Sequence, residues 1–453
     1  MAVYIKEIRL EDVRGFRGAR RVSLDLTRPD GTLAGWTVVA GRNGSGKTSL
    51  LRAMALAVAG PAVARGLVDD FGTWVSAGAD FGLSSVWLTP DPEADGFLGD
   101  DLPAADIFRI GLGWRLLRPT SPNRTELRPL LRPVYFGDGV DRLAEAGPWS
   151  ENPAGWFCAA YGPFRRLAGG SGEAHRLMLN TGPAGRMTSL FHEDASLAEG
   201  VTWLIEQHLR ALEGRPGAAE LKQAALAVLG DGLLPDGFRI HDVDSDGLWV
   251  RDGNRRFPLR EMSDGYRTVA ALVVDLLKQL HRTYGRLAVE ERDGTTTVTD
   301  PGVVLIDEVD AHLHVFWQKR IGVWLKRHFP RIQFIVTTHS PYVCQAADEQ
   351  GLIRLPAPGE DEPPTVVDQA RYERIVYGSG DDAVVSDLFG LDTPYSEEAV
   401  RLRRELVSLE TDVLAGRAGA DAVRRYEQLR HRLSSSPATR AVELAAGLLA
   451  DAG

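Results

Sequence analysis

The segment Gly41-Arg42-Asn43-Gly44-Ser45-Gly46-Lys47-Thr48 constrains this chain most, because it has the complete G-x-x-x-x-G-K-T form of a phosphate-binding loop. Its glycines let backbone N–H groups turn toward a β-phosphate, Lys47 reaches the β/γ oxygens, and the Thr48 hydroxyl ligates a metal. An apolar run at 36–40 precedes the loop and helical spacing at 49–58 follows it, which predicts strand, loop and helix. We therefore expect a nucleoside triphosphate and Mg²⁺ to bind at Gly41, Asn43, Gly44, Gly46, Lys47, Thr48 and Ser49.

Three later segments complete the pattern. Met262-Ser263-Asp264-Gly265 comes directly before an apolar helical stretch, so Ser263 and Gly265 offer a hydroxyl and free N–H groups at a helix start, which suits an anion but also an ordinary N-cap. Val303–Ile306 reads as a buried strand that ends in Asp307 and Glu308, followed by Asp310. A second buried strand at 333–337 ends in Thr338-His339-Ser340.

Composition limits the partners. With 453 residues, 44% of them hydrophobic, the chain can bury a large core, and no stretch of 18 uncharged apolar residues indicates a membrane span. The first residues lack the pattern of a secretory signal, so we expect a cytoplasmic protein.

A net charge of −10 argues against nonspecific coating of nucleic acid, although a local basic groove stays possible. Cys158 and Cys344 lie in apolar surroundings and suit reduced core thiols.

Periodicity predicts the remaining elements. Residues 3–10 and 21–26 alternate apolar and polar, which indicates an edge-type antiparallel pair, and strands with long loops are expected between 61 and 152. Helices are expected at 196–212, 218–229, 268–280 and 317–328, and a hairpin at 238–251 over Ser245-Asp246-Gly247. The strand–helix–strand order over 303–337 implies a parallel sheet. Three amphipathic helices are expected at 399–414, 420–433 and 439–449.

The order of these motifs resembles the ABC-type ATPases. The likeness extends to the branch of RecF-type repair and chromosome-maintenance ATPases, and especially to the prokaryotic AAA-family ATPases related to the overcoming-lysogenization-defect proteins and to the ATPase of the Septu defence system. Ile8-x-Leu10 to Gly15-Phe16-Arg17 is similar to the first strands of that branch, and Asp307 to His314 is similar to its extended Walker B. In the signature, Asp264-Gly265-Tyr266-Arg267 stands where transporters have Gly-Gly-Gln, and Val315 stands where relatives commonly have proline.

The resemblance implies an α/β fold. It would be an ABC-type P-loop head with a mixed β-sheet core, an antiparallel β N-terminal lobe, a compact helical insertion and an α-helical C-terminal appendix. The expected boundaries are 1–160 for the N-terminal part of the head with a β-rich insertion, 161–255 for the helical and hairpin insertion, 256–356 for the C-terminal part of the head, and 365–453 for a mainly helical region.

The resemblance also implies residue roles. Thr48 and Asp307 would hold Mg²⁺, Glu308 would polarise the attacking water as general base, and His339 would contact the γ-phosphate. Ser263 and Gly265 would be the signature that reaches the nucleotide of an opposite subunit, and Asp310 would lie in the D-loop. The link from Tyr161 to Arg166 is the expected place of the Q-loop, although no glutamine stands there. A zinc site at Asp307, Asp310, His312 and His314 is disfavoured, since it would leave the phosphate loop unexplained.

Two functions follow from these expectations. The first is an ATPase that dimerises, or forms a higher oligomer, on ATP and acts as a conformational switch for a separate nuclease effector in antiviral defence; the chain itself shows no nuclease pattern. The alternative is a RecF-like clamp on duplex DNA, for which arginines 14–21 and the basic residues of 319–327 would form the channel, while the arginine-rich stretch 115–132 fits a solvated surface better. A transporter subunit is disfavoured by the long middle region and the unusual signature.

Overall fold

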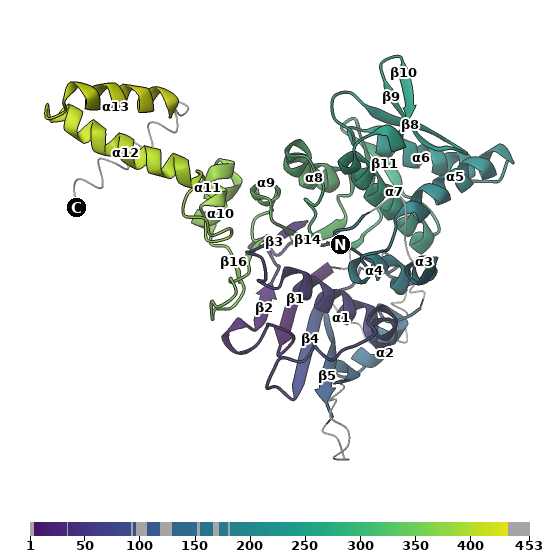
Figure 1. Cartoon of the computed structure of the whole chain (residues 1–453). Helices are drawn as coiled ribbons and strands as arrows, with labels where there is room; N and C mark the ends of the chain where they lie inside the picture. The colour runs from purple at the N-terminus through teal and green to yellow at the C-terminus, as the bar shows by residue number, and fades with distance from the viewer. Residues whose placement is uncertain are drawn as a thin grey trace. The chain divides into compact units, whose positions relative to one another are not determined.

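The structure is a computed structural model in which two compact units can be distinguished, residues 1–383 and 384–453. It describes residues 4–33, 35–91, 94–96, 107–117, 129–151, 155–165, 172–179 and 182–433. Figure 1 shows the course of the chain through the elements of each unit. The domain boundaries expected at 160, 255, 356 and 365 stay predictions.

A six-stranded sheet forms the centre of unit 1. Its strand order is β16 (Thr365–Val366), β15 (Leu352–Arg354), β3 (Trp36–Ala40), β14 (Ile332–Thr338), β13 (Gly302–Ile306) and β7 (Cys158–Tyr161). All neighbouring pairs are parallel except β15 and β16, so the predicted mixed sheet is confirmed. Strands β3, β13 and β14 are buried along their whole lengths, which explains their unbroken apolar runs.

Helices cover both faces of this sheet. Helix α1 (Lys47–Leu67) shares one buried cluster with residues of this sheet and of the five-stranded sheet of the N-terminal lobe. Helix α8 (Val315–His328) packs on the other face, where a Cβ on Gly322 would come within 2.8 Å of the Trp36 ring. By length and composition α1 could cross a membrane, but 67% of its apolar window is buried inside the protein. The buried core helix of a protein that does not cross a membrane can have the same length and apolar composition.

Helix α1 has a break at Gly60 and Pro61. Gly60 takes a φ of 83°, and a side chain there would collide with the ring of Trp149. Pro61 has no N–H to donate to the carbonyl of Ala57, four residues earlier. The indole Nε1 of Trp149 donates to that carbonyl instead, at 2.9 Å, so the buried acceptor is satisfied despite the break.

The N-terminal lobe is a five-stranded antiparallel sheet. Its order is β2 (Val22–Asp25), β1 (Tyr4–Glu11), β4 (Phe81–Thr89), β5 (Phe108–Leu116) and β6 (Pro129–Phe136). The antiparallel pair of β1 and β2 is confirmed. This pair lies at one end of the sheet as predicted, with β2 as the outer strand and β1 pairing with β4 on its other side. The alternation of apolar and polar residues along β1 arises because one face of the sheet is buried and the other is polar.

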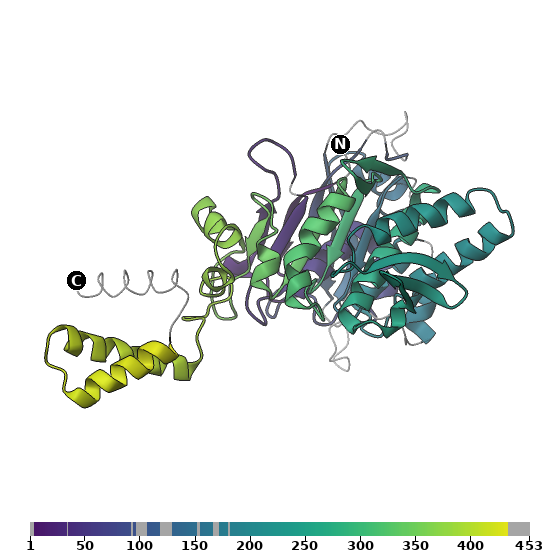
Figure 2. The same cartoon turned by 90° about the horizontal axis from the view of Figure 1, so that it is seen from above.

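Helices and two small sheets form the rest of unit 1. Figures 1 and 2 show α5 (Ala198–Leu212), α6 (Ala218–Gly230) and the sheet of β8 (Arg239–Asp244), β9 (Gly247–Asp252) and β10 (Arg255–Pro258) grouped at one end, beside α7 (Asp264–Tyr284). The predicted hairpin therefore has a third strand, β10. A separate hairpin joins β11 (Val289–Arg292) to β12 (Thr295–Val298). The shorter helices are α2 (Val140–Ala146), α3 (Gly172–Leu179), α4 (Pro183–Phe191), α9 (Pro341–Cys344), α10 (Gln369–Val376) and α11 (Gly380–Val384), the last of which ends at the first residue of unit 2.

In unit 2, helices α12 (Glu397–Leu414) and α13 (Ala420–Arg432) confirm two of the three helices predicted for the tail. They pair through Glu405 and Arg425, whose side chains form two hydrogen bonds. The third predicted helix, at 439–449, lies outside the described residues.

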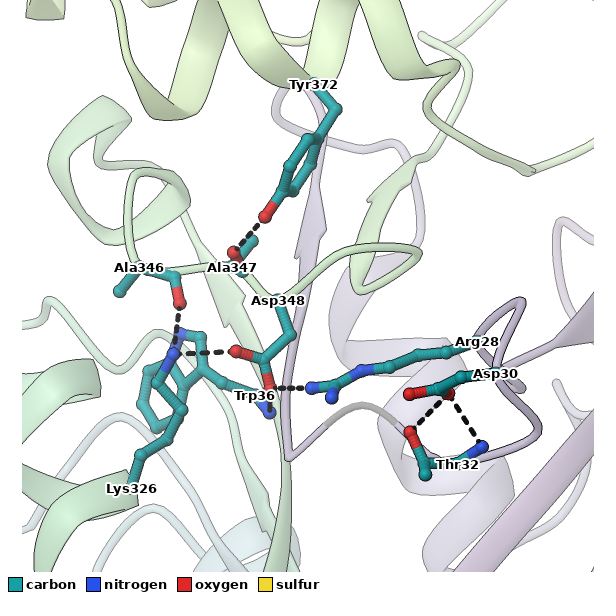
Figure 3. A network of polar contacts seen from close by, with 9 residues as sticks. All are labelled: Arg28, Asp30, Thr32, Trp36, Lys326, Ala346, Ala347, Asp348 and Tyr372. Carbon is teal, nitrogen blue, oxygen red and sulfur yellow. Dashed lines mark hydrogen bonds and ion pairs between the residues drawn. The ribbon is translucent and has the colours of Figure 1, made fainter.

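The N-terminal end of β3 is anchored by one carboxylate (Figure 3). Asp348 accepts hydrogen bonds from Arg28 at 2.6 Å, from Lys326 at 2.7 Å and from the backbone N–H of Trp36 at 3.0 Å. The Tyr372 hydroxyl donates to the neighbouring carbonyl of Ala347. Asp348 thus ties β3 to the last turn of α8, which leaves the opposite end of β3 rigidly placed for the phosphate loop.

Candidate nucleotide site

The phosphate loop follows β3 at the carboxyl end of the parallel sheet, where ligands of such sheets bind. Gly46 is the N-cap of α1 at a φ of 104°, and a Cβ there would come within 2.8 Å of the Phe16 ring. Only glycine fits this position, because the left-handed conformation and the neighbouring ring both exclude a side chain. Asn43 and Gly44 are exposed at the tip of the loop, whereas Thr48 and Ser49 lie half-buried in the first turn of α1.

Lys47 is buried and directed back at its own loop. Its ammonium group donates to the carbonyls of Gly41 at 2.8 Å and Arg42 at 3.2 Å. Burial lowers the pKa of Lys47, and the carboxylates of Glu308, Asp307 and Asp310 oppose that shift.

Asp307 joins the two halves of the site, although about 260 residues separate them. Its carboxylate accepts from the Thr48 hydroxyl at 2.7 Å and from the Thr337 hydroxyl at 2.6 Å, and its side chain is almost fully buried. The predicted pairing of Thr48 with Asp307 is therefore present in the geometry. Hydroxyl and carboxylate oxygens are the hard donors that Mg²⁺ prefers, so the residues present fit this ion.

The chain turns sharply after Asp307. Glu308 has a φ of 45°, and its N–H donates to the Thr337 hydroxyl at 2.7 Å. Asp310 accepts from the Thr338 hydroxyl at 2.5 Å and from the backbone N–H of His339 at 3.3 Å. Because β14 lies between β3 and β13 in the sheet, His339 emerges between the phosphate loop and the two carboxylates. Partial burial lowers the pKa of His339, and the positive charge of Lys47 adds to that shift.

The signature segment begins α7 and contacts another part of the same chain. Ser263 is the exposed N-cap residue, and a Cβ on Gly265 would come within 2.6 Å of the carbonyl of His312. His314 caps α8 by accepting the N–H of Phe316. The structure thus assigns His314 a helix-capping contact, while Asp307 and Asp310 are hydrogen-bonded to threonines.

Three residues of the site were not predicted from sequence. Thr337 lies in the predicted buried strand 333–337, Thr338 begins the segment Thr338-His339-Ser340, and Arg165 lies in the expected Q-loop, but the sequence predicts no site role for any of them. Arg165 is 2% exposed, and its guanidinium donates to four backbone carbonyls. Two threonines at the end of a largely apolar strand are the available signal, because buried hydroxyls require partners.

The basic residues expected to line a DNA channel make local contacts. Arg20 donates to the carbonyls of Ser45, Pro356, Ala357 and Glu360, and Arg17 donates to that of Ala77. Arg14 lies over the Trp74 ring, Lys319 over Tyr342, and Lys326 pairs with Asp348. These contacts account for much of the basic set without a nucleic acid.

Comparisons with known proteins agree with this site. The family described as "AAA domain, putative AbiEii toxin, Type IV TA system" matches residues 220–345, and the family described as "AAA domain" matches residues 7–84. Together these segments contain the phosphate loop, the signature and the carboxylates. They leave the middle of the chain and the tail unmatched.

Curated relatives carry defence-associated names. The chain is 25% identical to Septu protein PtuA of Bacillus mycoides over 73% of its own length and 38% of the relative's. It is 41% identical to the Retron Ec83 probable ATPase of Escherichia coli over 23% of its length and 18% of the relative's. A second Septu protein PtuA, of Bacillus thuringiensis, is 30% identical over 36% of the chain and 40% of the relative. The matched region thus spans less than half the length of each.

Solved structures similar to the chain include an Smc head bound to the C-winged helix domain of ScpA, with a TM-score of 0.46 and 16% identity over 80% of this chain and 97% of that one. The SMC head domain from Thermotoga maritima aligns with a TM-score of 0.42 and 13% identity over 81% of this chain and all of that one.

Proposed function

We propose that this chain, a relative of the Septu and retron ATPases, binds ATP with Mg²⁺, hydrolyses it, and uses the cycle as a conformational switch. The observation that carries the proposal is the hydrogen bond between Thr48 and Asp307, because it brings a phosphate loop and a metal-binding carboxylate together with Glu308 as the next residue. The name "probable ATPase" of the retron relatives supports ATP as the nucleotide.

Each residue of the nucleotide site would have a role that follows from its position. Lys47 and the N–H groups of the loop would bind the phosphates, and Thr48 and Asp307 would hold Mg²⁺, which neutralises charge on the phosphate oxygens. Glu308 would accept the proton of the attacking water, while His339 would donate to the γ-phosphate. A neutral imidazole fits that role, because the lowered pKa of His339 leaves one ring N–H as a donor at neutral pH.

The switch would operate between two copies of the chain. Ser263 is exposed at the start of α7, so it is accessible to a nucleotide bound by a second copy. ATP would then close a dimer or a higher oligomer and hydrolysis would open it, with Asp310 at the contact between the copies. The Septu and retron names of the relatives support a place in antiviral defence and control of a separate nuclease effector.

The proposal is tested by measuring phosphate release by wild-type protein and by Glu308→Gln. We expect Glu308→Gln to keep ATP affinity and to lose turnover by roughly 100-fold or more, the scale of a lost general base. Glu290→Gln is the matched control, since it makes the same change at an exposed carboxylate paired with Arg292. Turnover by Glu308→Gln at the wild-type rate would disprove the assignment.

Duplex DNA added to the same assay separates the switch from the clamp. The local contacts of Arg14, Arg17 and Arg20 favour the switch, for which we expect slow basal turnover without stimulation by DNA. Strong stimulation that Glu308→Gln abolishes would support the RecF-like clamp instead.

A further inference from the structure

Arg165 lies behind the carboxylates of the site with its charge turned toward backbone. Its Nη1 donates to the carbonyls of Gly162 at 2.9 Å and Asp307 at 3.0 Å. Its Nη2 donates to the carbonyls of Glu308 at 3.1 Å and Val309 at 3.2 Å. A fully buried guanidinium that binds four carbonyls is an unusual use of a charged side chain, since buried arginines usually pair with an acid.

The three carbonyls of 307–309 could not converge in an extended chain. In a strand successive carbonyls point in opposite directions, so one guanidinium would reach only alternate ones. They converge here because Glu308 adopts a left-handed conformation, with a φ of 45°, that non-glycine residues rarely take. Such a conformation persists only where the surroundings hold it.

Two contacts hold Glu308 from opposite sides. The Thr337 hydroxyl binds its N–H at 2.7 Å, and Arg165 binds its carbonyl at 3.1 Å. With the N–H and the carbonyl both fixed, the direction of the side chain is set by the backbone. The Arg165 fork and Thr337 thus hold the backbone from which the Glu308 side chain leaves, which limits the positions that its carboxylate can reach.

We propose that Arg165 is a positioning residue for ATP hydrolysis, which holds the turn after β13 so that Glu308 faces the γ-phosphate. This inference rests on the function proposed above. Arg165 touches neither nucleotide nor water in this role, and it acts through Glu308. Lysine can replace it only in part, because an ammonium lacks the planar fork that reaches four acceptors on one side.

Arg165→Ala and Arg165→Lys test the inference, with Arg186→Ala and Arg186→Lys as matched controls. Arg186 is also buried, at 4% exposure, and burial lowers the pKa of each arginine to about 10. Arg186 donates to the Thr283 hydroxyl and has no contact with the turn after β13 among its described bonds. The Arg165 and Arg186 variants therefore both lose a buried guanidinium group, but only the Arg165 variants lose the contacts with the turn after β13.

We expect kcat to fall roughly 100-fold in Arg165→Ala and less in Arg165→Lys, with the Kd for ATP changed by less than about threefold, because a small displacement of a catalytic group costs on this order. Guanidinium ion at millimolar concentration should restore part of the turnover of Arg165→Ala. It should restore none in Glu308→Gln, which retains Arg165.

Two outcomes would overturn the inference. One is unchanged kcat in both Arg165 variants. The other is an equal fall in the Arg165 and Arg186 variants, in step with their thermal unfolding and without rescue by guanidinium, which would make Arg165 a purely structural residue. Failure of the proposed function would look different, because wild-type protein would then show no turnover that Glu308→Gln abolishes.

Discussion

At the scale of single residues, threonine hydroxyls place the acids of the site. Thr337 both donates to Asp307 and accepts the N–H of Glu308, and Thr338 donates to Asp310. A hydroxyl can serve in both directions at once, which a methyl group of the same shape cannot. The carboxylates thus depend on side chains that would not themselves meet the nucleotide.

Thr337→Val should therefore lower both stability and turnover. The valine is nearly isosteric, but it leaves the buried Asp307 carboxylate and the Glu308 N–H without this partner, which costs about 1–3 kcal/mol. Thr337→Ser should retain most of the wild-type kcat. Urea unfolding and phosphate release measure the two effects, and a Thr337→Val variant with wild-type values for both would contradict the assigned contacts.

Some residues of the nucleotide site could be predicted from the sequence, and others could not. The Gly41–Thr48 spacing predicted the loop, and the apolar strand before Asp307 predicted a carboxylate near Thr48, because both signals are local. Arg165 gave no such signal, since its four acceptors include backbone carbonyls of residues more than 140 positions away. Every residue has a backbone carbonyl, so a hydrogen bond to one cannot be predicted from the side chain of the partner residue.

Asp95 should make stability depend on pH. Burial raises the pKa of Asp95 to about 7, whereas an unfolded aspartate titrates near 4. The unfolded chain loses its proton first as pH rises from about 4 to 7, so the folded state loses up to roughly 1.4 kcal/mol for each unit in that window. Asp95→Asn should be more stable than wild type at pH 8 and equal to it below pH 4. Thermal unfolding across this range tests the sign, and a constant difference would contradict it.

At the scale of elements, helix α7 connects the signature to the carboxylates. Asp275, in its middle, accepts from the Tyr161 hydroxyl at 3.0 Å and from Lys278 at 3.4 Å, and all three side chains are buried. The carbonyl of Tyr161 in turn accepts the N–H of Asp307 at 2.8 Å. A polar core therefore joins the helix that begins at Ser263 to the strand end that presents Asp307.

Single changes in the pair of Asp275 and Lys278 should be more harmful than the double change. Asp275→Asn leaves the buried ammonium without its carboxylate, and Lys278→Met removes a donor from the buried carboxylate, each costing about 3–5 kcal/mol. The double variant has neither charge, so it should recover much of that loss. Urea midpoints at constant m-value measure the coupling, and additive losses would show that the pair does not interact.

Elements were predicted well where their pattern was continuous. Strands β13 and β14 and helices α5 to α8 were recognised, because long apolar or amphipathic runs dominate local preferences. Strand β6 lies in the stretch where strands are expected, but its bounds could not be predicted because Pro129, Arg132 and Pro133 break its pattern, which its place at the sheet edge tolerates. Helix α4 was missed for a related reason, since Pro183 and Gly185 make a short helix with weak propensity.

At the scale of the whole molecule, every described residue of the candidate site belongs to unit 1. The expected nucleotide ligands lie between Gly41 and His339, within unit 1, whereas the tail helices α12 and α13 belong to unit 2. Binding of a single nucleotide should thus be a property of residues 1–395.

A chain that ends at residue 395 should bind ATP with a Kd within about twofold of the full chain, because all the expected nucleotide ligands belong to unit 1. Calorimetric titration of Glu308→Gln in both lengths, without turnover, measures this. Light scattering of the same samples with ATP would show whether the tail is needed for a dimer. A large loss of affinity in the shorter chain would place the tail in the binding site.

The strand order also determines when the molecule can fold. All strands of the antiparallel lobe lie within residues 4–136 and can pair as soon as they leave the ribosome, whereas β3 has only β14 and β15 as neighbours. At usual synthesis rates the roughly 300 residues between them take about 15–60 s to appear. For that time β3, the buried strand before the phosphate loop, has no partner, so the newborn chain should expose it until residues 332–354 have been made.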